Sequence, residues 1–111
     1  MPLLLIATVD QVQPGSTRFF DVGGRSVVLA NCDGRFYAVD GLCPHKGFEL
    51  DNAQLFGCVI ECPWHRYQYD VRTGENCYPL NVYPCDLPVP VEPIATHRIE
   101  LRGSEIWVEL I

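Results

Sequence analysis

Two short Cys–His pairs stand out among the residues able to do chemistry. Residues 43–45 have the sequence Cys-Pro-His and, after sixteen intervening residues, 62–65 have Cys-Pro-Trp-His. Thiolates and imidazoles are the side chains that bind zinc and iron. Packing alone rarely produces two matched pairs that both begin Cys-Pro. The spacing therefore predicts one metal centre held by four side chains: Cys43, His45, Cys62 and His65.

Two kinds of metal centre are compatible with this donor set. A closed Cys2His2 zinc site is tetrahedral, but zinc fingers usually group their two cysteines together and their two histidines together. Here each loop mixes one cysteine with one histidine. A Rieske-type 2Fe-2S centre takes two thiolates on one iron and two imidazoles on the other, which two mixed loops can supply. The pattern favours the iron–sulfur cluster, and a zinc-stabilised interaction domain is the less favoured alternative.

The stretch from 43 to 75 resembles the Rieske family. The resemblance rests on the two Cys–His motifs, on Cys-Pro-His-Lys-Gly at 43–47, and on Tyr-Asp at 69–70 followed by Arg-Thr-Gly-Glu at 72–75. It implies an all-β fold, a Rieske-like β-sandwich with a small cluster-binding subdomain at about 41–75. It also implies one 2Fe-2S cluster per chain, with the cysteines on one iron and the histidines on the other.

The surroundings of the cluster can be compared with family members from respiratory complexes. Those members resemble one another in having one extra cysteine in each cluster loop. This chain has Phe48 and Trp64 at the equivalent positions and so lacks both cysteines. They also carry a serine and a tyrosine two and four residues after the second histidine, where this chain has Tyr67 and Tyr69. Hydrogen bonds to the sulfurs raise the potential, so one remaining donor predicts a low potential. We expect four residues to lie beside the cluster: Tyr69, Tyr67, Trp64 and Gly47. The conformational freedom of glycine at 47 lets the first loop bend back.

The resemblance implies a soluble electron carrier of the type that serves oxygenases. The expected partners are a flavin-dependent ferredoxin reductase, which supplies single electrons, and a terminal oxygenase, which is a ring-hydroxylating dioxygenase or a multicomponent monooxygenase. The chain itself is then not an enzyme. The alternative is a small Rieske subunit of an assembled reductase, of the nitrite-reductase small-subunit type.

Two positive charges directly follow the predicted histidine ligands. Lys46 is the only lysine, and Arg66 stands where related ferredoxins often have glycine, so a different backbone is expected there. The chain otherwise carries a net charge of −6, which argues against a nucleic acid or an anionic membrane as partner. We therefore predict that Lys46 and Arg66 form the partner-docking surface.

Composition and length limit which fold and location are expected for the chain. With 111 residues and 48% hydrophobic content, a single domain over 1–111 is expected. The apolar stretch at 3–7 is too short for a signal-peptide core or a membrane span, and it predicts a first strand. A cytoplasmic location follows, where thiols stay reduced. The cysteines outside the motifs are then predicted to be free thiols: Cys32, Cys58, Cys77 and Cys85. His97 is predicted to be a surface residue.

The elements that must position these side chains are short strands separated by turn dipeptides. Gly-Gly at 23–24, Asp-Gly at 33–34 and Gly-Ser at 103–104 predict three hairpins, between strands at 18–22, 25–31, 35–40, 98–102 and 105–110. A two-residue turn at 103–104 pairs Leu101 with Ile106 and Ile99 with Val108, so the apolar side chains share one face. The segment 76–96 holds five of the nine prolines and predicts an extended connection with edge-strand fragments.

Overall fold

The computed structural model describes residues 3–43, 49–63, 66–78 and 93–110. Within these ranges the chain forms ten β-strands and a single turn of 3-10 helix. No helix in these ranges is long and apolar enough to cross a bilayer. The elements in chain order are β1 (Leu3–Thr8), η1 (Val9–Gln11), β2 (Thr17–Val22), β3 (Arg25–Cys32), β4 (Arg35–Asp40), β5 (Gln54–Phe56), β6 (Val59–Glu61), β7 (Gln68–Asp70), β8 (Asn76–Tyr78), β9 (Thr96–Arg102) and β10 (Glu105–Glu109).

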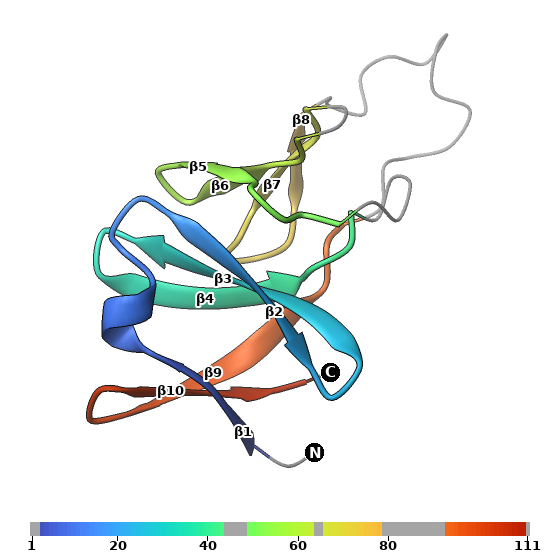
Figure 1. The fold of residues 1–111 in the computed structure, drawn as a ribbon. Helices are drawn as coiled ribbons and strands as arrows, with labels where there is room; N and C mark the ends of the chain where they lie inside the picture. The colour runs from blue at the N-terminus through green and yellow to red at the C-terminus, as the bar shows by residue number, and fades with distance from the viewer. Residues whose placement is uncertain (1–2, 44–48, 64–65, 79–92, 111) are drawn as a thin grey trace, which may run out of the picture.

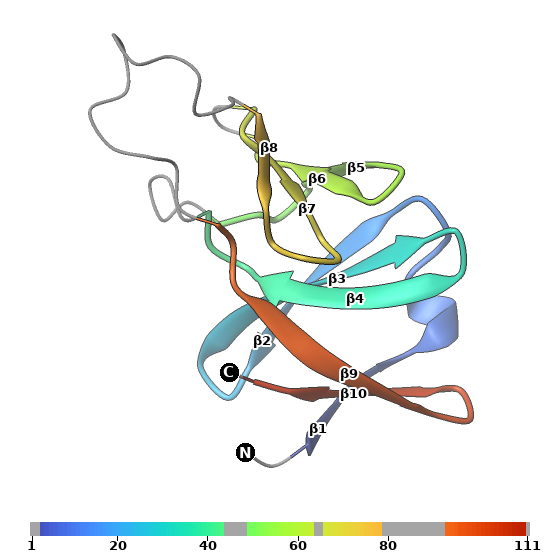
Figure 2. The same cartoon turned by 180° about the vertical axis from the view of Figure 1, so that it is seen from behind.

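The larger sheet is antiparallel, with strand order β1-β10-β9-β4-β3-β2 (Figure 1). It folds over on itself because β9 bends from its partner β10 to pair with β4, through Ala38 opposite His97 and Val39 opposite Thr96 (Figure 2). The halves β1-β10-β9 and β4-β3-β2 therefore lie as two layers, and apolar residues from both fill the space between them: Ala7, Val12, Val27, Leu29, Ala38, Ile106, Val108 and Leu110.

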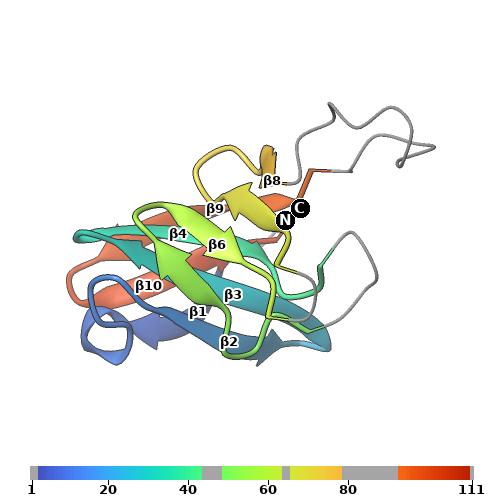
Figure 3. The same ribbon diagram turned by 90° about the horizontal axis from the view of Figure 1, so that it is seen from above.

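The smaller sheet has strand order β5-β6-β7-β8 and covers the outer face of β3 and β4 (Figure 3). Its core joins Val28 and Val39 to Ile60 and Tyr69 of the small sheet. β3 is therefore buried on both faces, with Val27 and Leu29 in one core and Val28 and Ala30 in the other. A strand covered on both sides needs a continuous apolar run rather than an alternating one, as its sequence has.

The three predicted hairpins are confirmed. Gly23 and Gly24 have φ angles of 58° and 87°, and Asp33 and Gly34 have 53° and 93°. Left-handed angles at both central residues match the twist of the flanking strands. At the third hairpin Leu101 pairs with Ile106 and Ile99 with Val108, in the predicted register. The all-β fold is as expected.

The strands of the smaller sheet are less evident from sequence. β5, β6 and β7 have three residues each and lie inside 41–75, the segment expected to form the cluster-binding subdomain. Three residues give too short a run for alternating polarity to be recognised. Within the proline-rich segment, β8 and the start of β9 are strands, while 79–92 lies outside the described residues. β8 lies at the edge of its sheet.

Candidate metal centre

The first cysteine loop leaves the larger sheet at the end of β4. Gly41 permits this exit, because a Cβ there would lie 2.6 Å from Cβ of Ser26. The Gly41 N–H donates to the Ser26 carbonyl (2.7 Å), and the Leu50 N–H returns to the Gly41 carbonyl (2.8 Å). These bonds close the base of the loop, and the Cys43 side chain is directed inward, so the residue is only 1% exposed.

The second loop leaves the smaller sheet at the end of β6 and is closed by backbone bonds. The Arg66 N–H donates to the Cys62 carbonyl (3.0 Å), and the Cys62 N–H donates to the Tyr67 carbonyl (2.7 Å). Arg66 has φ 59°, a left-handed conformation that glycine adopts with less strain. The loop therefore requires a glycine-like backbone at a position occupied by arginine. The Arg66 residue itself is exposed, whereas Cys62 is fully buried.

Tyr69 lies between the two loops. It pairs with Ile60 across β6 and β7, and it is fully buried in the core that also contains both loop cysteines, Cys43 and Cys62. Its hydroxyl is 3.8 Å from Sγ of Cys43. Burial first, and then the Cys43 thiol, raise the pKa of Tyr69 far above its ordinary value. The phenol therefore remains protonated at neutral pH and can donate a hydrogen bond toward sulfur.

The turn between β7 and β8 fixes the position of Tyr69. The Asp70 carboxylate accepts two hydrogen bonds from the Arg72 guanidinium, at 3.0 and 2.8 Å, and these hold the pKa of Asp70 below its usual range. The Gly74 N–H donates to the Asp70 carbonyl (2.6 Å), and the Ile94 N–H donates to the Gly74 carbonyl (2.9 Å). This link to the chain entering β9 was not anticipated from the sequence, although Thr-Gly at 73–74 is a turn signal.

Several predicted site residues lie outside the described ranges: His45, Lys46, Gly47, Trp64 and His65. Within the described ranges no three potential ligands gather around a point. What the structure brings together is two buried thiols that form no disulfide, Cys43 and Cys62, in one core cluster beside a protonated phenol. This half of the donor set suits iron–sulfur ligation, which needs thiolates shielded from water and hydrogen-bond donors near sulfur.

The prediction for His97 is wrong. His97 is only 6% exposed, and its Nε2 lies 2.8 Å from Oδ1 of Asp40. The reason is its register, because His97 stands opposite Ala38, whose side chain points into the core between the layers. The Asp40 carboxylate also accepts from Arg25 (3.3 Å). His97 thus joins β9 to β4.

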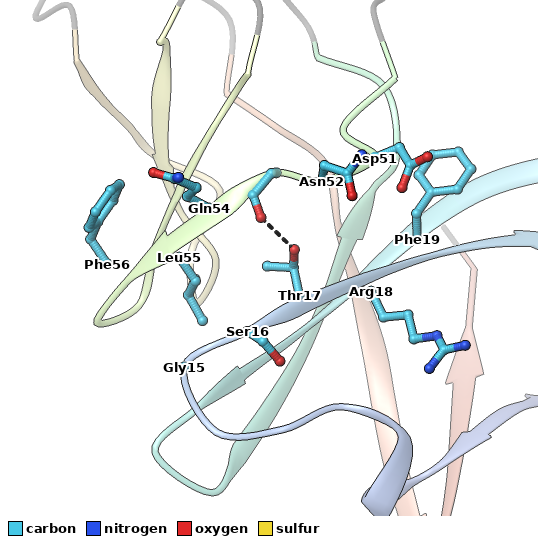
Figure 4. Close-up of a pocket in the computed structure, with 11 residues that line it drawn as sticks. Gly15, Ser16, Thr17, Arg18, Phe19, Asp51, Asn52, Gln54, Leu55 and Phe56 are labelled. Carbon is cyan, nitrogen blue, oxygen red and sulfur yellow. Dashed lines mark hydrogen bonds between the residues drawn. The ribbon is translucent and has the colours of Figure 1, made fainter.

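One cavity lies apart from the predicted metal ligands. A cavity of about 690 Å³ lies between β2 and the chain leading into β5, where the Thr17 hydroxyl donates to the Ala53 carbonyl at 2.7 Å (Figure 4). Its walls are residues 15–19 and 51–56, which include none of the predicted ligands. As Figure 4 shows, Arg18 is directed away from the cavity's centre.

The fold and the paired cysteine loops define a class of protein, an all-β sandwich carrying a buried thiol pair beneath a second, smaller sheet. Residues 3–85 match the Rieske [2Fe-2S] domain family. The chain belongs to this family.

Curated relatives are ferredoxin components of oxygenase systems. The ferredoxin component of the alkene monooxygenase system of Xanthobacter autotrophicus (strain ATCC BAA-1158 / Py2) is 36% identical over 88 residues, covering 78% of this chain and 72% of the relative. The ferredoxin component of the naphthalene 1,2-dioxygenase system of Pseudomonas putida is 36% identical over 103 residues, covering 92% and 89%.

Solved structures agree with the sequence comparison. The ferredoxin of carbazole 1,9a-dioxygenase from Nocardioides aromaticivorans IC177 superposes with a TM-score of 0.81 at 32% identity, covering 97% of both chains. A chain from the complex of reduced oxygenase and oxidized ferredoxin in carbazole 1,9a-dioxygenase gives 0.77 at 28% identity, covering 96% of this chain and 91% of that one. The expected Rieske-like sandwich is therefore confirmed.

Proposed function

We propose that this chain is a Rieske ferredoxin that carries single electrons from a flavin-dependent reductase to a terminal oxygenase. The observation that carries the proposal is its similarity, along most of its length, to ferredoxin components of both dioxygenase and monooxygenase systems. A ferredoxin–oxygenase complex among the similar structures supports direct contact with an oxygenase. In this role the chain transfers electrons and converts no substrate. We place it in the cytoplasm, where most thiols are kept reduced.

We further propose that Cys43 and Cys62 bind one iron and that His45 and His65 bind the other, within one domain whose cluster-binding subdomain spans about 41–75. When bound, the 2Fe-2S cluster supplies a one-electron redox couple. Burial of both cysteines supports their role, because it shields the thiolates from water. The family match favours this centre over a closed zinc site.

Tyr69 is the residue proposed to tune this centre. Its protonated hydroxyl lies 3.8 Å from Sγ of Cys43, and the residue is fully buried. A donor aimed at a ligand sulfur stabilises the more negative reduced state and raises the potential. Tyr67 occupies the position of the second donor in respiratory relatives, and without a serine there we expect a potential low in the Rieske range.

Lys46 and Arg66 are proposed to orient the partner. Arg66 is exposed directly after the second loop's histidine, on a chain of net charge −6. Charges at the rim of a contact act mainly on the association rate and on its dependence on salt. A positive rim beside the cluster loops suits an acidic face on the partner, while the acidic remainder of the chain disfavours other orientations.

The test is electron transfer measured by stopped flow. The reduced holoprotein is mixed, at low ionic strength, with the oxidised terminal oxygenase of the naphthalene 1,2-dioxygenase or of the alkene monooxygenase system. We expect rapid second-order oxidation. Lys46→Glu combined with Arg66→Glu should slow it about tenfold or more and flatten its response to salt.

The matched control is Arg35→Glu, an exposed residue at the opposite end of β4 from Cys43. It should leave the rate within about twofold of wild type, because a single exposed charge far from the contact is screened by solvent. Failure of both oxygenases to oxidise the wild-type protein would contradict the proposed function. Equal rates for the double variant and wild type would contradict the docking surface alone.

A further inference from the structure

Two cysteines outside the metal-binding motifs meet where the two sheets join. Cys32 is the last residue of β3, and Cys58 lies in the turn between β5 and β6. In all three views this turn lies beside the turn that joins β3 to β4 (Figures 1, 2 and 3). Both cysteines are free thiols. They lie at the end of β6 remote from Cys62, so they are separate from the predicted cluster ligands.

The two thiols lie at one junction of the sheets and open onto one cavity. Cys58 packs against the core cluster to which Cys32 belongs. Both line a cavity of about 360 Å³ whose other walls are Pro14, Gly15, Asp33 and Gly57. The pair therefore has room beside it for a small molecule.

The two thiols differ in exposure. Cys32 is 5% exposed, whereas Cys58 is half-buried. Burial, and then a hydrogen bond with Cys58, raise the pKa of Cys32 to about 12. Because the thiolate is the reactive form and Cys58 is the more exposed of the two, Cys58 is the first to meet a reagent in solution. A more exposed thiol beside a buried one is the arrangement of an attacking and a resolving cysteine.

The donor set argues against a structural metal at this place. A closed zinc site takes four ligands, and the described residues hold no group of three potential ligands. Two thiols alone are sufficient for disulfide chemistry.

We propose that Cys32 and Cys58 form a dithiol–disulfide site that reacts with low-molecular-weight disulfides such as oxidised glutathione. The Cys58 thiolate attacks one sulfur of the reagent, forming a mixed disulfide and releasing one thiolate, which takes up the proton lost by Cys58. Cys32 then attacks Sγ of Cys58, breaks the mixed disulfide and releases the second thiol with the proton of Cys32. The reagent is reduced to two thiols, and the protein gains one disulfide.

The resulting bond would tie the end of β3 in the larger sheet to the β5–β6 turn of the smaller one. The chain segment closed by it, 32–58, includes Cys43 and the first cysteine loop. Oxidation would therefore restrain the small sheet on its base without using a cluster ligand. The site does not depend on which oxygenase or reductase the protein serves.

The test is peptide mapping of the intact holoprotein after anaerobic incubation with oxidised glutathione at mildly alkaline pH. Remaining thiols are alkylated with iodoacetamide, and the chain is cut with trypsin and a glutamate-specific protease. Trypsin releases Cys32 in peptide 26–35, and cleavage after Glu49 and Glu61 releases Cys58 in 50–61, apart from Cys62. We expect these two peptides joined by a disulfide, a mass lower by two hydrogen atoms than that of the reduced pair, and an unchanged visible spectrum of the cluster.

Variants separate this pair from the other thiols. Cys58→Ser should abolish the linked peptide, and Cys32→Ser should leave a stable glutathione adduct on Cys58. Cys77→Ser, which removes another half-buried free thiol, should leave the linkage intact. Mapping of the wild-type protein decides the question even where a variant fails to fold. A stable glutathione adduct on Cys58 of the wild-type protein, or linkage of Cys32 to a different cysteine, would overturn the proposal.

Discussion

Removing the hydroxyl of Tyr69 should lower the midpoint potential. Tyr69→Phe keeps the ring in a fully buried position and deletes the group that lies 3.8 Å from Sγ of Cys43. Because the ring still fills its place in the core, the fold and the ligand set should survive. The substitution therefore isolates one hydrogen bond.

The expected size follows from the geometry. A hydrogen bond contributes about 1 kcal/mol net, and at 3.8 Å to sulfur we assign about 0.5–1 kcal/mol to the difference between the two oxidation states. For a one-electron couple about 59 mV corresponds to a tenfold change, or about 1.4 kcal/mol. Tyr69→Phe should thus lower the potential by about 20–40 mV.

The assay is spectroelectrochemical titration of wild type and variant under identical conditions. The matched control is Tyr37→Phe, which deletes a phenolic hydroxyl from a residue of β4 that packs against the same core. The control should leave the potential unchanged. An unchanged or higher potential in Tyr69→Phe would refute the reasoning, because the hydroxyl would then not stabilise the reduced state.

Three further substitutions test the supporting structure. In Gly74→Ala, at a φ of 82°, the added Cβ would overlap the carbonyl oxygen of Ile94. We therefore expect the free energy of unfolding in urea to fall by about 2–4 kcal/mol. The control is Gly57→Ala, where φ is 63° and no atom lies near the added Cβ, and its free energy of unfolding should fall by about 1–2 kcal/mol. Equal losses would contradict the close contact. Arg66→Gly should be more stable than Arg66→Ala by about 1 kcal/mol, because glycine adopts a φ of 59° without strain. A more stable Arg66→Ala variant would exclude the left-handed backbone at this residue. His97→Ala should lower the melting temperature, because it removes a buried side chain, and it should retain the EPR spectrum of the cluster. Loss of that spectrum in a folded variant would indicate that His97 belongs to the metal centre.

The parts of the fold set by local chemistry could be predicted from the sequence. The Gly-Gly and Asp-Gly turns require left-handed backbone angles, and these fix both the hairpins and their register. The last hairpin was predicted residue by residue because Ile99, Leu101, Ile106 and Val108 alternate with polar side chains. The metal-binding motifs were visible because four donors of two kinds recur in matched spacing.

The parts set by distant contacts could not be predicted. His97 is buried because β9 leaves β10 to pair with β4, and no neighbouring residue in the sequence signals that pairing. The shared position of Cys32 and Cys58 beside one cavity likewise arises where two sheets meet. The sequence predicts both cysteines as unrelated thiols, since neither the end of β3 nor the β5–β6 turn carries a sign of the other cysteine.

The most direct test of the central claim is the EPR spectrum of the reduced, purified protein, recorded alongside its iron and sulfide content. The account predicts the spectrum of a 2Fe-2S cluster with mixed cysteine and histidine ligation, lost in both His45→Ala and His65→Ala. A colourless protein that contains zinc, or a wild-type spectrum from His65→Ala, would contradict it.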